Sequence, residues 1–379
     1  MTSTTTAANS AAQAVEAADR HPFVARLRQY AEQTLRPAAL KTDRTEVPAE
    51  TINRLAELGA LNHLAPVAYG GAGLDRGADR RLHETIAGAC VNTWLVWAQH
   101  APIVGRVAAS LAEGRAPSEL AERLLRGRLL AGAGISDVRR FPEHFISATP
   151  ARGGWILDGT ITWVSGWGLN EALAVAAVEP GAGTVVTALV PVGEQTPATP
   201  LRLSAVTGSR TRRVRLDQVA VPEEHVLGTQ PIARWRTADL ATASDARPHH
   251  FGLAATVLRE LGAASHPLAP QVAAAWAPRI GQLRADAYGL SDEAAAAGGG
   301  PYRLDERLAL KVATGEALGT LTRALLVARS GHGIASEDTA QLHARSALFL
   351  LVQGQSTAVR EAQLAHFVHR APNRKEDLS

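Results

Sequence analysis

The residue types that could carry catalysis are scattered along this chain, and few of them fall into a known catalytic pattern. Gly71 and Gly73 form a Gly-Ala-Gly turn, but no third glycine completes a dinucleotide-binding fingerprint and no strand pattern precedes them. Ser165 lacks the leading glycine of a nucleophile elbow, so a serine hydrolase is not indicated. His249 and His250 are adjacent, which places them on different faces of a helix. No zinc-type Cys and His spacing occurs, and we expect no metal ligands.

The composition describes a globular chain and excludes several classes of protein. Of 379 residues, 46% are hydrophobic and 20% charged, which supplies enough apolar material for a core. The 39 basic and 36 acidic residues leave a formal charge of +3, too small and too evenly spread to indicate nucleic-acid binding. No apolar stretch is long enough to span a membrane, and the single cysteine, Cys90, fits a reducing compartment. We therefore expect a cytoplasmic protein with no nucleic-acid or membrane partner.

Hydrophobic periodicity changes twice along the chain and divides it into three zones. Residues 21–130 carry apolar side chains at helical spacing, whereas residues 131–232 form short apolar runs between turn residues, as strands do. Residues 233–370 are helical again and rich in Ala and Leu. We expect residues 1–20 to be a disordered polar leader without a secretory signal, and residues 371–379 to be a tail. The sequence thus predicts helices, then a β domain, then helices.

Segments in the first two zones resemble motifs of the acyl-CoA dehydrogenase superfamily of flavoproteins. Residues 65–73 (APVAYGGAG) are similar to the P-x-x-YGG-x-G turn of that family's N-terminal helical domain. Residues 154–159 (GWILDG) and 162–165 (TWVS) are similar to its G-x-x-L-x-G and W-[IV]-[ST] strand pair. Residues 216–222 (LDQVAVP) resemble the segment that closes its β domain.

Three C-terminal segments continue this resemblance in order and spacing. Residues 330–333 (SGHG), 344–347 (ARSA) and 353–355 (QGQ) follow the family's GG-x-G, RDA and EGT motifs. The resemblance implies an α+β fold with an N-terminal all-helical domain, a middle β-barrel-like domain and a C-terminal four-helix bundle. It also implies a homodimer or homotetramer. The apolar side chains of residues 345–352 exceed what one helix face can bury, which indicates such an interface.

The resemblance further implies a flavin between the β domain and the C-terminal bundle, FAD or alternatively FMN. Trp163 would stack on or shield the isoalloxazine ring, with Val164 beside it. The Ser165 hydroxyl would donate a hydrogen bond to the edge of the ring. Ser136 takes the position of a residue that contacts the pyrimidine end of the flavin.

The residues that would hold the adenine half of FAD match the family less well. Gly331 remains from the glycine pair and would let the backbone approach a pyrophosphate. Gln355 replaces the threonine of the EGT motif, and residues 261–270 (LGAASHPLAP) lack the arginine and phenylalanine of the family's ER-x-x-FG segment. Fewer anchors predict weaker binding of FAD or the use of a smaller flavin.

Both positions at which the family places its catalytic carboxylate are neutral in this chain. Dehydrogenation of an acyl thioester needs a base that removes the α-proton. Gln353 takes the position of the EGT glutamate, and Ala246 takes the alternative position before Arg247. Asp245 and the adjacent histidine pair that follows Arg247 are nearby substitutes.

Three functions therefore stay open. Two-component flavin monooxygenases are a branch of the superfamily that takes reduced flavin from a separate reductase and needs no α-proton base. Residues 93–100 (TWLVWAQH) are similar to a helix on the substrate side in that branch, so His100 is a candidate catalytic residue, and His332 is a second one. We favour a monooxygenase acting with O2 and a flavin reductase on a small or carrier-bound substrate. The alternatives are an acyl-CoA or acyl-carrier-protein dehydrogenase with a displaced base, and a non-catalytic member.

Overall fold

Helices form the first part of the chain in the computed structural model, which describes residues 17–370. The expected leader falls almost entirely outside these residues, and the expected tail falls wholly outside them. Three helices begin with a side chain or ring suited to that place: Pro22 opens the first helix, and Asp75 and Ser118 cap two later ones. The helices are α2 (Pro22–Tyr30), α3 (Arg36–Arg44), α4 (Ala49–Glu57), α5 (Arg76–Ala89), α6 (Val91–Ala98), α7 (Ala101–Ala112) and α8 (Glu119–Leu125), with a π-helical turn (Ala31–Leu35) joining α2 to α3.

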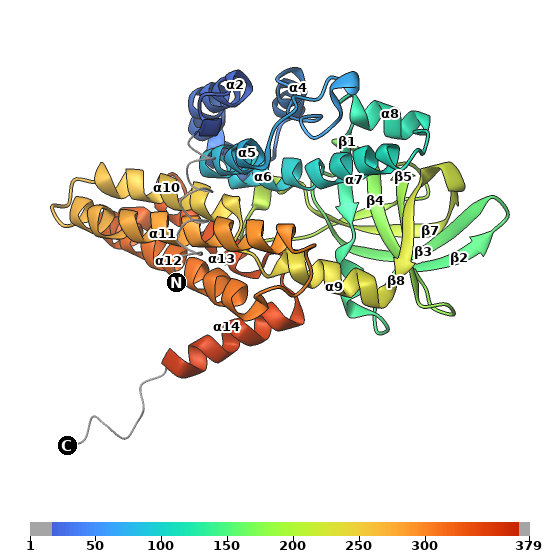
Figure 1. Cartoon of the computed structure of the whole chain (residues 1–379). Coiled ribbons are helices and arrows are strands. Elements are labelled where there is room, and N and C mark those ends of the chain that lie inside the picture. Colours follow the sequence, from blue (N-terminus) through green and yellow to red (C-terminus); the bar gives the residue numbers. More distant parts are fainter. Residues whose placement is uncertain (1–16, 371–379) are drawn as a thin grey trace.

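The middle of the chain is one curled sheet of eight strands (Figure 1). Seven of them follow the order β6-β7-β3-β2-β4-β5-β8, and the eighth, β1, pairs in parallel with β4. The strands β4 and β5 are buried on both faces, because one face lines the interior of the sheet and the other is covered by α7, α8 and α9. The strands are β1 (Leu130–Gly134), β2 (Ser147–Ala151), β3 (Gly154–Val164), β4 (Asn170–Glu179), β5 (Thr184–Pro191), β6 (Ala198–Pro200), β7 (Arg212–Pro222) and β8 (Val226–Pro231).

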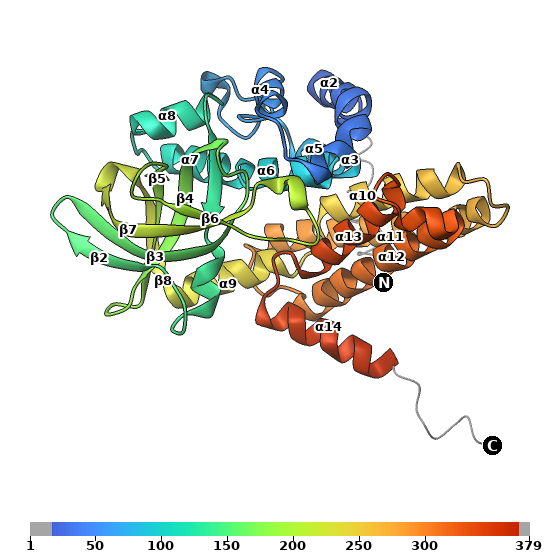
Figure 2. The same cartoon turned by 180° about the vertical axis from the view of Figure 1, so that it is seen from behind.

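The last part of the chain returns to helices, and four of them, α10 to α13, form the bundle. Figures 1 and 2 show the bundle and the β domain side by side, with α9 between them and α14 projecting from the bundle. The predicted order of helical domain, β domain and helical bundle is confirmed. No described helix is long and apolar enough to cross a membrane. The helices are α9 (Ile232–Ala243), α10 (Pro248–Gly262), α11 (Ala269–Ala296), α12 (Leu304–Arg329), α13 (Thr339–Val352) and α14 (Thr357–Arg370).

Two glycines allow α5 of the N-terminal part to lie directly against α10 of the bundle. A Cβ atom on Gly252 would lie 2.2 Å from the Glu84 carbonyl oxygen, and one on Gly88 would lie 2.7 Å from the Gly252 carbonyl oxygen. The Gly88 carbonyl also accepts hydrogen bonds from Thr256 Oγ1 (2.6 Å) and Arg36 Nη1 (2.9 Å). The two helices therefore meet backbone to backbone.

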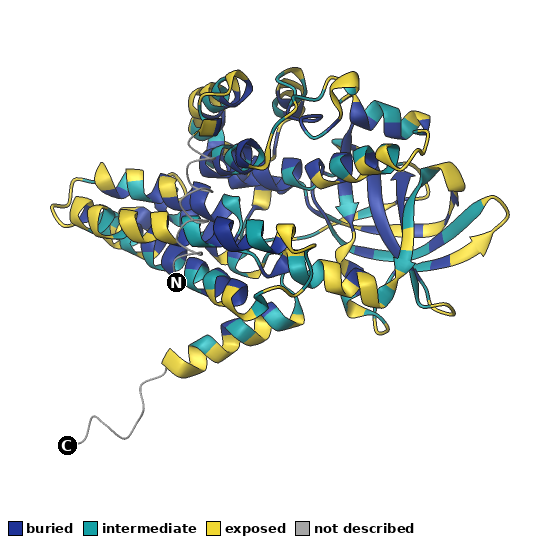
Figure 3. Cartoon of the chain, viewed as in Figure 1, coloured by how far each residue is buried: buried dark blue, intermediate teal, exposed yellow. Residues whose placement is uncertain are grey.

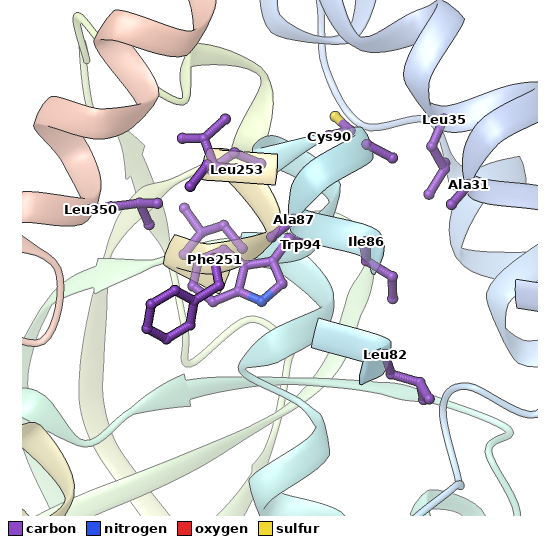
Figure 4. Close-up of a cluster of buried hydrophobic side chains, with 14 of the residues drawn as sticks. Ala31, Leu35, Leu82, Ile86, Ala87, Cys90, Trp94, Phe251, Leu253 and Leu350 are labelled. Atoms are coloured by element: carbon purple, nitrogen blue, oxygen red, sulfur yellow. The ribbon is translucent and has the colours of Figure 1, made fainter. Parts of the chain in front are cut away.

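Buried apolar side chains from both parts of the chain surround this contact. Figure 4 shows Ile86 of α5, Trp94 of α6, and Phe251 and Leu253 of α10 in one cluster. Figure 3 shows the same region as the buried centre between the exposed outer faces of the helices. The N-terminal helices and the bundle thus share one hydrophobic core.

We expect Gly252→Ala to lower the free energy of unfolding by about 2–3 kcal/mol, because the added methyl group must push α5 away from α10. Gly319→Ala in α12 is the matched control, since a Cβ atom there meets nothing within 4 Å. That substitution should stabilise the protein by about 0.5–1 kcal/mol through helix propensity alone. Urea denaturation of both variants measures the difference. Equal stabilities would show that the helices are not in backbone contact.

Candidate functional site

Trp163 and Phe349 face each other where the β domain meets the bundle. Trp163 lies near the end of β3 and is half-buried, and Phe349 lies on α13. Their ring centroids are 6.4 Å apart and their planes differ by 20°. The residue expected to contact a flavin ring thus lies at the junction of the two domains where that ring was expected.

A buried carboxylate fixes the position of Trp163 relative to the segment after β1. Asp137 accepts hydrogen bonds from Thr162 N (3.0 Å) and Thr162 Oγ1 (2.7 Å). The neighbouring Ser136 is exposed beside it, in a short helical turn. Asp137 therefore places Ser136 and Trp163 on the same part of the β domain.

Val164 and Ser165 are both buried, and they contribute in different ways. The Val164 side chain belongs to the core of the β domain, so only its backbone is available to a ligand. The Ser165 hydroxyl is 2.8 Å from Thr211 Oγ1, which is 2.7 Å from Ser209 Oγ. Three hydroxyl groups joined by two hydrogen bonds leave one hydrogen for another partner. Asn170 supports the segment by donating from Nδ2 to the Ser165 carbonyl (2.8 Å).

Arg139 connects the β domain to the segment that follows α13. Its guanidinium binds both carboxylate oxygens of Asp239 on α9, at 2.7 and 2.8 Å, and reaches the Gln355 carbonyl at 3.4 Å. The Gln355 amide donates to Gln363 Oε1 (2.8 Å). The side-chain amide of Gln353, by contrast, makes no hydrogen bond to any residue that the structure describes. Gln353 is therefore available to a ligand, whereas Gln355 is engaged.

Gly331 and His332 lie elsewhere, on the exposed turn Ser330–Ile334 between α12 and α13. No hydrogen bond links either of them to another candidate residue within the described part of the chain. Their proposed roles stay predictions. A surface hollow of about 250 Å³ between α7, α8 and β8 is lined by none of the candidate residues.

His100 is fully buried, and both of its ring nitrogens contact the backbone. Its Nε2 lies 2.6 Å from the Leu61 carbonyl oxygen, and its Nδ1 accepts from Ala131 N (3.0 Å). Burial lowers the pKa of His100 to about 4, so the ring is neutral near pH 7. This geometry favours a structural role that joins the end of α6, the loop that contains Leu61 and β1, and it leaves no ring nitrogen for a substrate.

The residues considered as substitute bases are also engaged or weakly basic. Asp245 Oδ1 accepts from Arg307 Nε (2.7 Å), and Asp245 Oδ2 accepts from Ser291 Oγ (3.0 Å). Burial lowers the pKa of His250 to about 3, and it lowers the pKa of His249 well below the usual value. Asp245 is therefore held by two hydrogen bonds, and both histidine rings are neutral near pH 7.

Sequence reasoning missed three residues that shape this region: Asp137, Phe349 and Lys311. Lys311 is buried on α12, and burial together with the charge of Arg247 lowers its pKa to about 7. The available signal was a single lysine between apolar residues at helical spacing. Asp137 and Phe349 had no such signal, because their partners are distant in sequence.

Comparison with known proteins agrees with this architecture. Residues 18–125 match the family model "Acyl-CoA dehydrogenase, N-terminal domain". A glutaryl-CoA dehydrogenase from Mycobacterium smegmatis, solved in complex with FADH2, superposes with a TM-score of 0.71 at 18% identity, covering 94% of this chain and 96% of that one. Residues 18–125 thus correspond to the N-terminal domain of the acyl-CoA dehydrogenase family, and the chain as a whole has the fold of that family. The resemblance noted in the sequence is thereby confirmed.

Another similar structure contains a different flavin. KijD3, solved in complex with FMN and a dTDP-linked amino-keto sugar, superposes with a TM-score of 0.74 at 19% identity, covering 93% of this chain and 94% of that one. The human mitochondrial short-chain specific acyl-CoA dehydrogenase is 23% identical over 226 residues, which are 57% of this chain and 55% of that protein. The chain thus spans little more than half the length of the curated relatives that it matches.

We expect acid to destabilise this fold, and His100 to account for part of the effect. His83 and His100 have pKa values of about 4 when folded because of burial, against about 6.5 when unfolded. Below pH 6.5 the unfolded chain takes up protons that the folded chain excludes, so stability falls as pH drops towards 4, by up to about 1.4 kcal/mol per pH unit for each histidine.

His100→Gln should lower stability at pH 7 by about 1–3 kcal/mol, because a backbone hydrogen bond is lost. It should also make the loss between pH 6.5 and 4 less steep than in the wild type. His369→Gln, at an exposed position on α14, is the control. Urea denaturation across this pH range measures both slopes, and an unchanged slope for His100→Gln would show that the ring is protonated in the fold.

Proposed function

We propose that this chain is a flavin-dependent oxidoreductase that acts as a monooxygenase, using reduced flavin and O2 on a small or carrier-bound substrate. The observation that carries the proposal is the absence of a free carboxylate at either of the two positions where the base is expected. Gln353 and Ala246 are neutral, and Asp245 is paired with Arg307. Removal of an α-proton from a thioester needs such a base, whereas oxygenation by reduced flavin does not.

A flavin fits the residues present at the junction of the β domain and the bundle. Trp163 and Phe349 offer two aromatic faces, and the buried hydroxyl chain that ends at Ser165 has one hydrogen to donate. When bound in reduced form, a flavin supplies the electrons for O2. The FADH2 and FMN in the structures of two relatives support FAD or FMN as the cofactor.

The roles of this chain's own residues follow from their positions. The Trp163 ring covers apolar surface and excludes water from the junction, while Ser165 orients the edge of the flavin through its hydroxyl group, which can donate or accept a hydrogen bond. Gln353 orients the substrate through its unpaired amide, which donates and accepts but does not take up a proton near neutral pH. Ser136, Val164, Gly331 and Gln355 remain proposed flavin contacts through their positions in the superfamily motifs.

Dehydrogenation of an acyl-CoA or acyl-carrier-protein thioester is the second candidate function. The match of residues 18–125 to the acyl-CoA dehydrogenase model and the human short-chain relative favour it. It would require a base displaced from both usual positions. A non-catalytic member that binds a ligand without redox chemistry is the third.

Two kinds of protein partner belong to the proposal. A monooxygenase of this type takes its reduced flavin from a separate flavin reductase. Exposed apolar side chains on the neighbouring helices α12, α13 and α14 support a homodimer or homotetramer, because large apolar side chains left exposed in numbers often belong to an interface. These side chains are Val327, Leu348, Val352, Leu364, Phe367 and Val368.

The absorption spectrum of the purified protein, followed by titration with FAD and FMN, tests the flavin proposal. Trp163→Ala should weaken flavin binding by about 1–3 kcal/mol, because a half-buried aromatic contact is lost. Trp155→Ala, on the same strand away from the junction, should leave the flavin affinity unchanged. Equal affinities for wild type and Trp163→Ala would contradict the assignment. Bleaching of bound flavin by an acyl thioester without O2 would favour the dehydrogenase instead.

Gln353→Glu should introduce exchange of the α-protons of a short acyl thioester with deuterated solvent. The substitution is nearly isosteric and puts a carboxylate in a partly apolar site, where burial raises its pKa towards neutrality. Gln355→Glu is the matched control, because that side chain is already bonded to Gln363. NMR follows the exchange. Fast exchange by the wild type would reveal another base and would favour the dehydrogenase over the monooxygenase.

A further inference from the structure

Cationic side chains outnumber carboxylates where the amino end of α10 meets α12. Arg80 binds both oxygens of Asp292 at 2.8 Å, and Arg76 approaches Asp292 at 2.8 Å as well. Arg307 is paired with Asp245 at 2.7 Å. The two carboxylates of this cluster are therefore already paired.

Arg247 and Lys311, the two remaining cations, contact backbone oxygens only. Arg247 Nη2 donates to the Thr242 carbonyl (2.9 Å), and Lys311 Nζ donates to the Asp245 carbonyl (3.4 Å). Neither comes within 4.0 Å of a carboxylate oxygen in the described part of the chain. Asp79, which also influences Arg247, accepts a hydrogen bond from His63 (2.9 Å). The half-buried Arg247 thus lacks a direct counter-charge, and so does the buried Lys311 whenever it is protonated.

His249 adds an unsatisfied hydrogen-bonding group in the first turn of α10. Its side chain is buried, its ring lies 4.1 Å from that of Trp94, and its Nε2 has no hydrogen-bond partner among the described residues. Buried polar atoms usually have a partner in the protein or a ligand. The amino end of a helix carries unpaired N–H groups and a partial positive charge, which attract an anion.

We propose that Arg247, Lys311 and His249 bind a carboxylate or phosphate group of the substrate. The amino end of α10 is also where the superfamily places its alternative base, here Ala246, so the anionic group would lie beside the reacting part of the substrate. The neutral side chains of Ala246 and Gln353 remove the two carboxylates that would repel it. The ligand is thus an anion, and only its identity as a substrate rests on the proposed function.

Inorganic phosphate and acetate are the probes that test the anion site. Thermal unfolding of the full chain is followed against probe concentration at constant ionic strength, for the wild type, Lys311→Met and Lys41→Met. Lys41 is an exposed lysine on α3 and serves as the matched charge control. The probes should stabilise wild type and Lys41→Met alike, while Lys311→Met should bind them about tenfold more weakly, since a charged hydrogen-bond donor is lost.

The stability without any probe gives an independent reading. Lys311→Met should unfold at a higher temperature than the wild type, because methionine replaces a buried charge that has no counter-charge. A structural lysine would give the opposite shift. Unchanged probe affinity in Lys311→Met, or a lower unfolding temperature, would overturn the proposal.

Riboflavin and FMN distinguish the source of the anionic group. If the site binds substrate, Lys311→Met keeps the wild-type affinity for both flavins. If Lys311→Met loses affinity for FMN but not for riboflavin, the site binds the flavin phosphate, and the assignment to substrate is overturned. Failure of the wild type to bind any flavin would remove the proposed function but leave the phosphate result standing, so the two failures are distinguishable.

Discussion

The backbone contact between Gly88 and Gly252 determines where the first turn of α10 lies, and the candidate site depends on that turn. His249 and Arg247 lie within five residues of Gly252, so any shift of α10 away from α5 would move them. Thr256 and Arg36 both donate to the Gly88 carbonyl, which holds the crossing in one register. The two glycines where α5 crosses α10 therefore determine the position of Arg247 and His249 at the start of α10.

A second link joins the N-terminal helices to α13. Asp43 of α3 accepts hydrogen bonds from Asn92 Nδ2 of α6 (2.9 Å) and Arg345 Nη2 of α13 (2.6 Å). Arg345 lies one turn before Phe349, the residue that faces Trp163. The N-terminal helices thus hold both α10 and α13 in place, although most of the flavin contacts proposed lie in the β domain. Substitutions that disturb the N-terminal helices should therefore also change the structure of the domain junction.

The order of the domains could be predicted from the sequence, because hydrophobic periodicity shows which residues of each segment are buried and so separates helices from strands. The strand motif also placed Trp163 at the end of a β-strand, where the structure has it, and its flavin contact stays a prediction. The sequence did not show that Asp245 pairs with Arg307 or that His100 is bonded to Leu61 and Ala131. These partners are tens of residues apart, and periodicity says which face a residue occupies but not which side chain lies opposite.

The three hydroxyl groups of Ser209, Thr211 and Ser165 have a property that a single hydroxyl lacks. Each oxygen–hydrogen bond can rotate, so the two hydrogen bonds can run from Ser209 towards Ser165 or in the reverse direction. In the first direction the Ser165 oxygen offers a hydrogen to its neighbour, and in the second it offers a lone pair. The N5 edge of a flavin accepts a hydrogen bond when oxidised and donates one when reduced. One rotation along the row would match either redox form, without the displacement of any atom heavier than hydrogen.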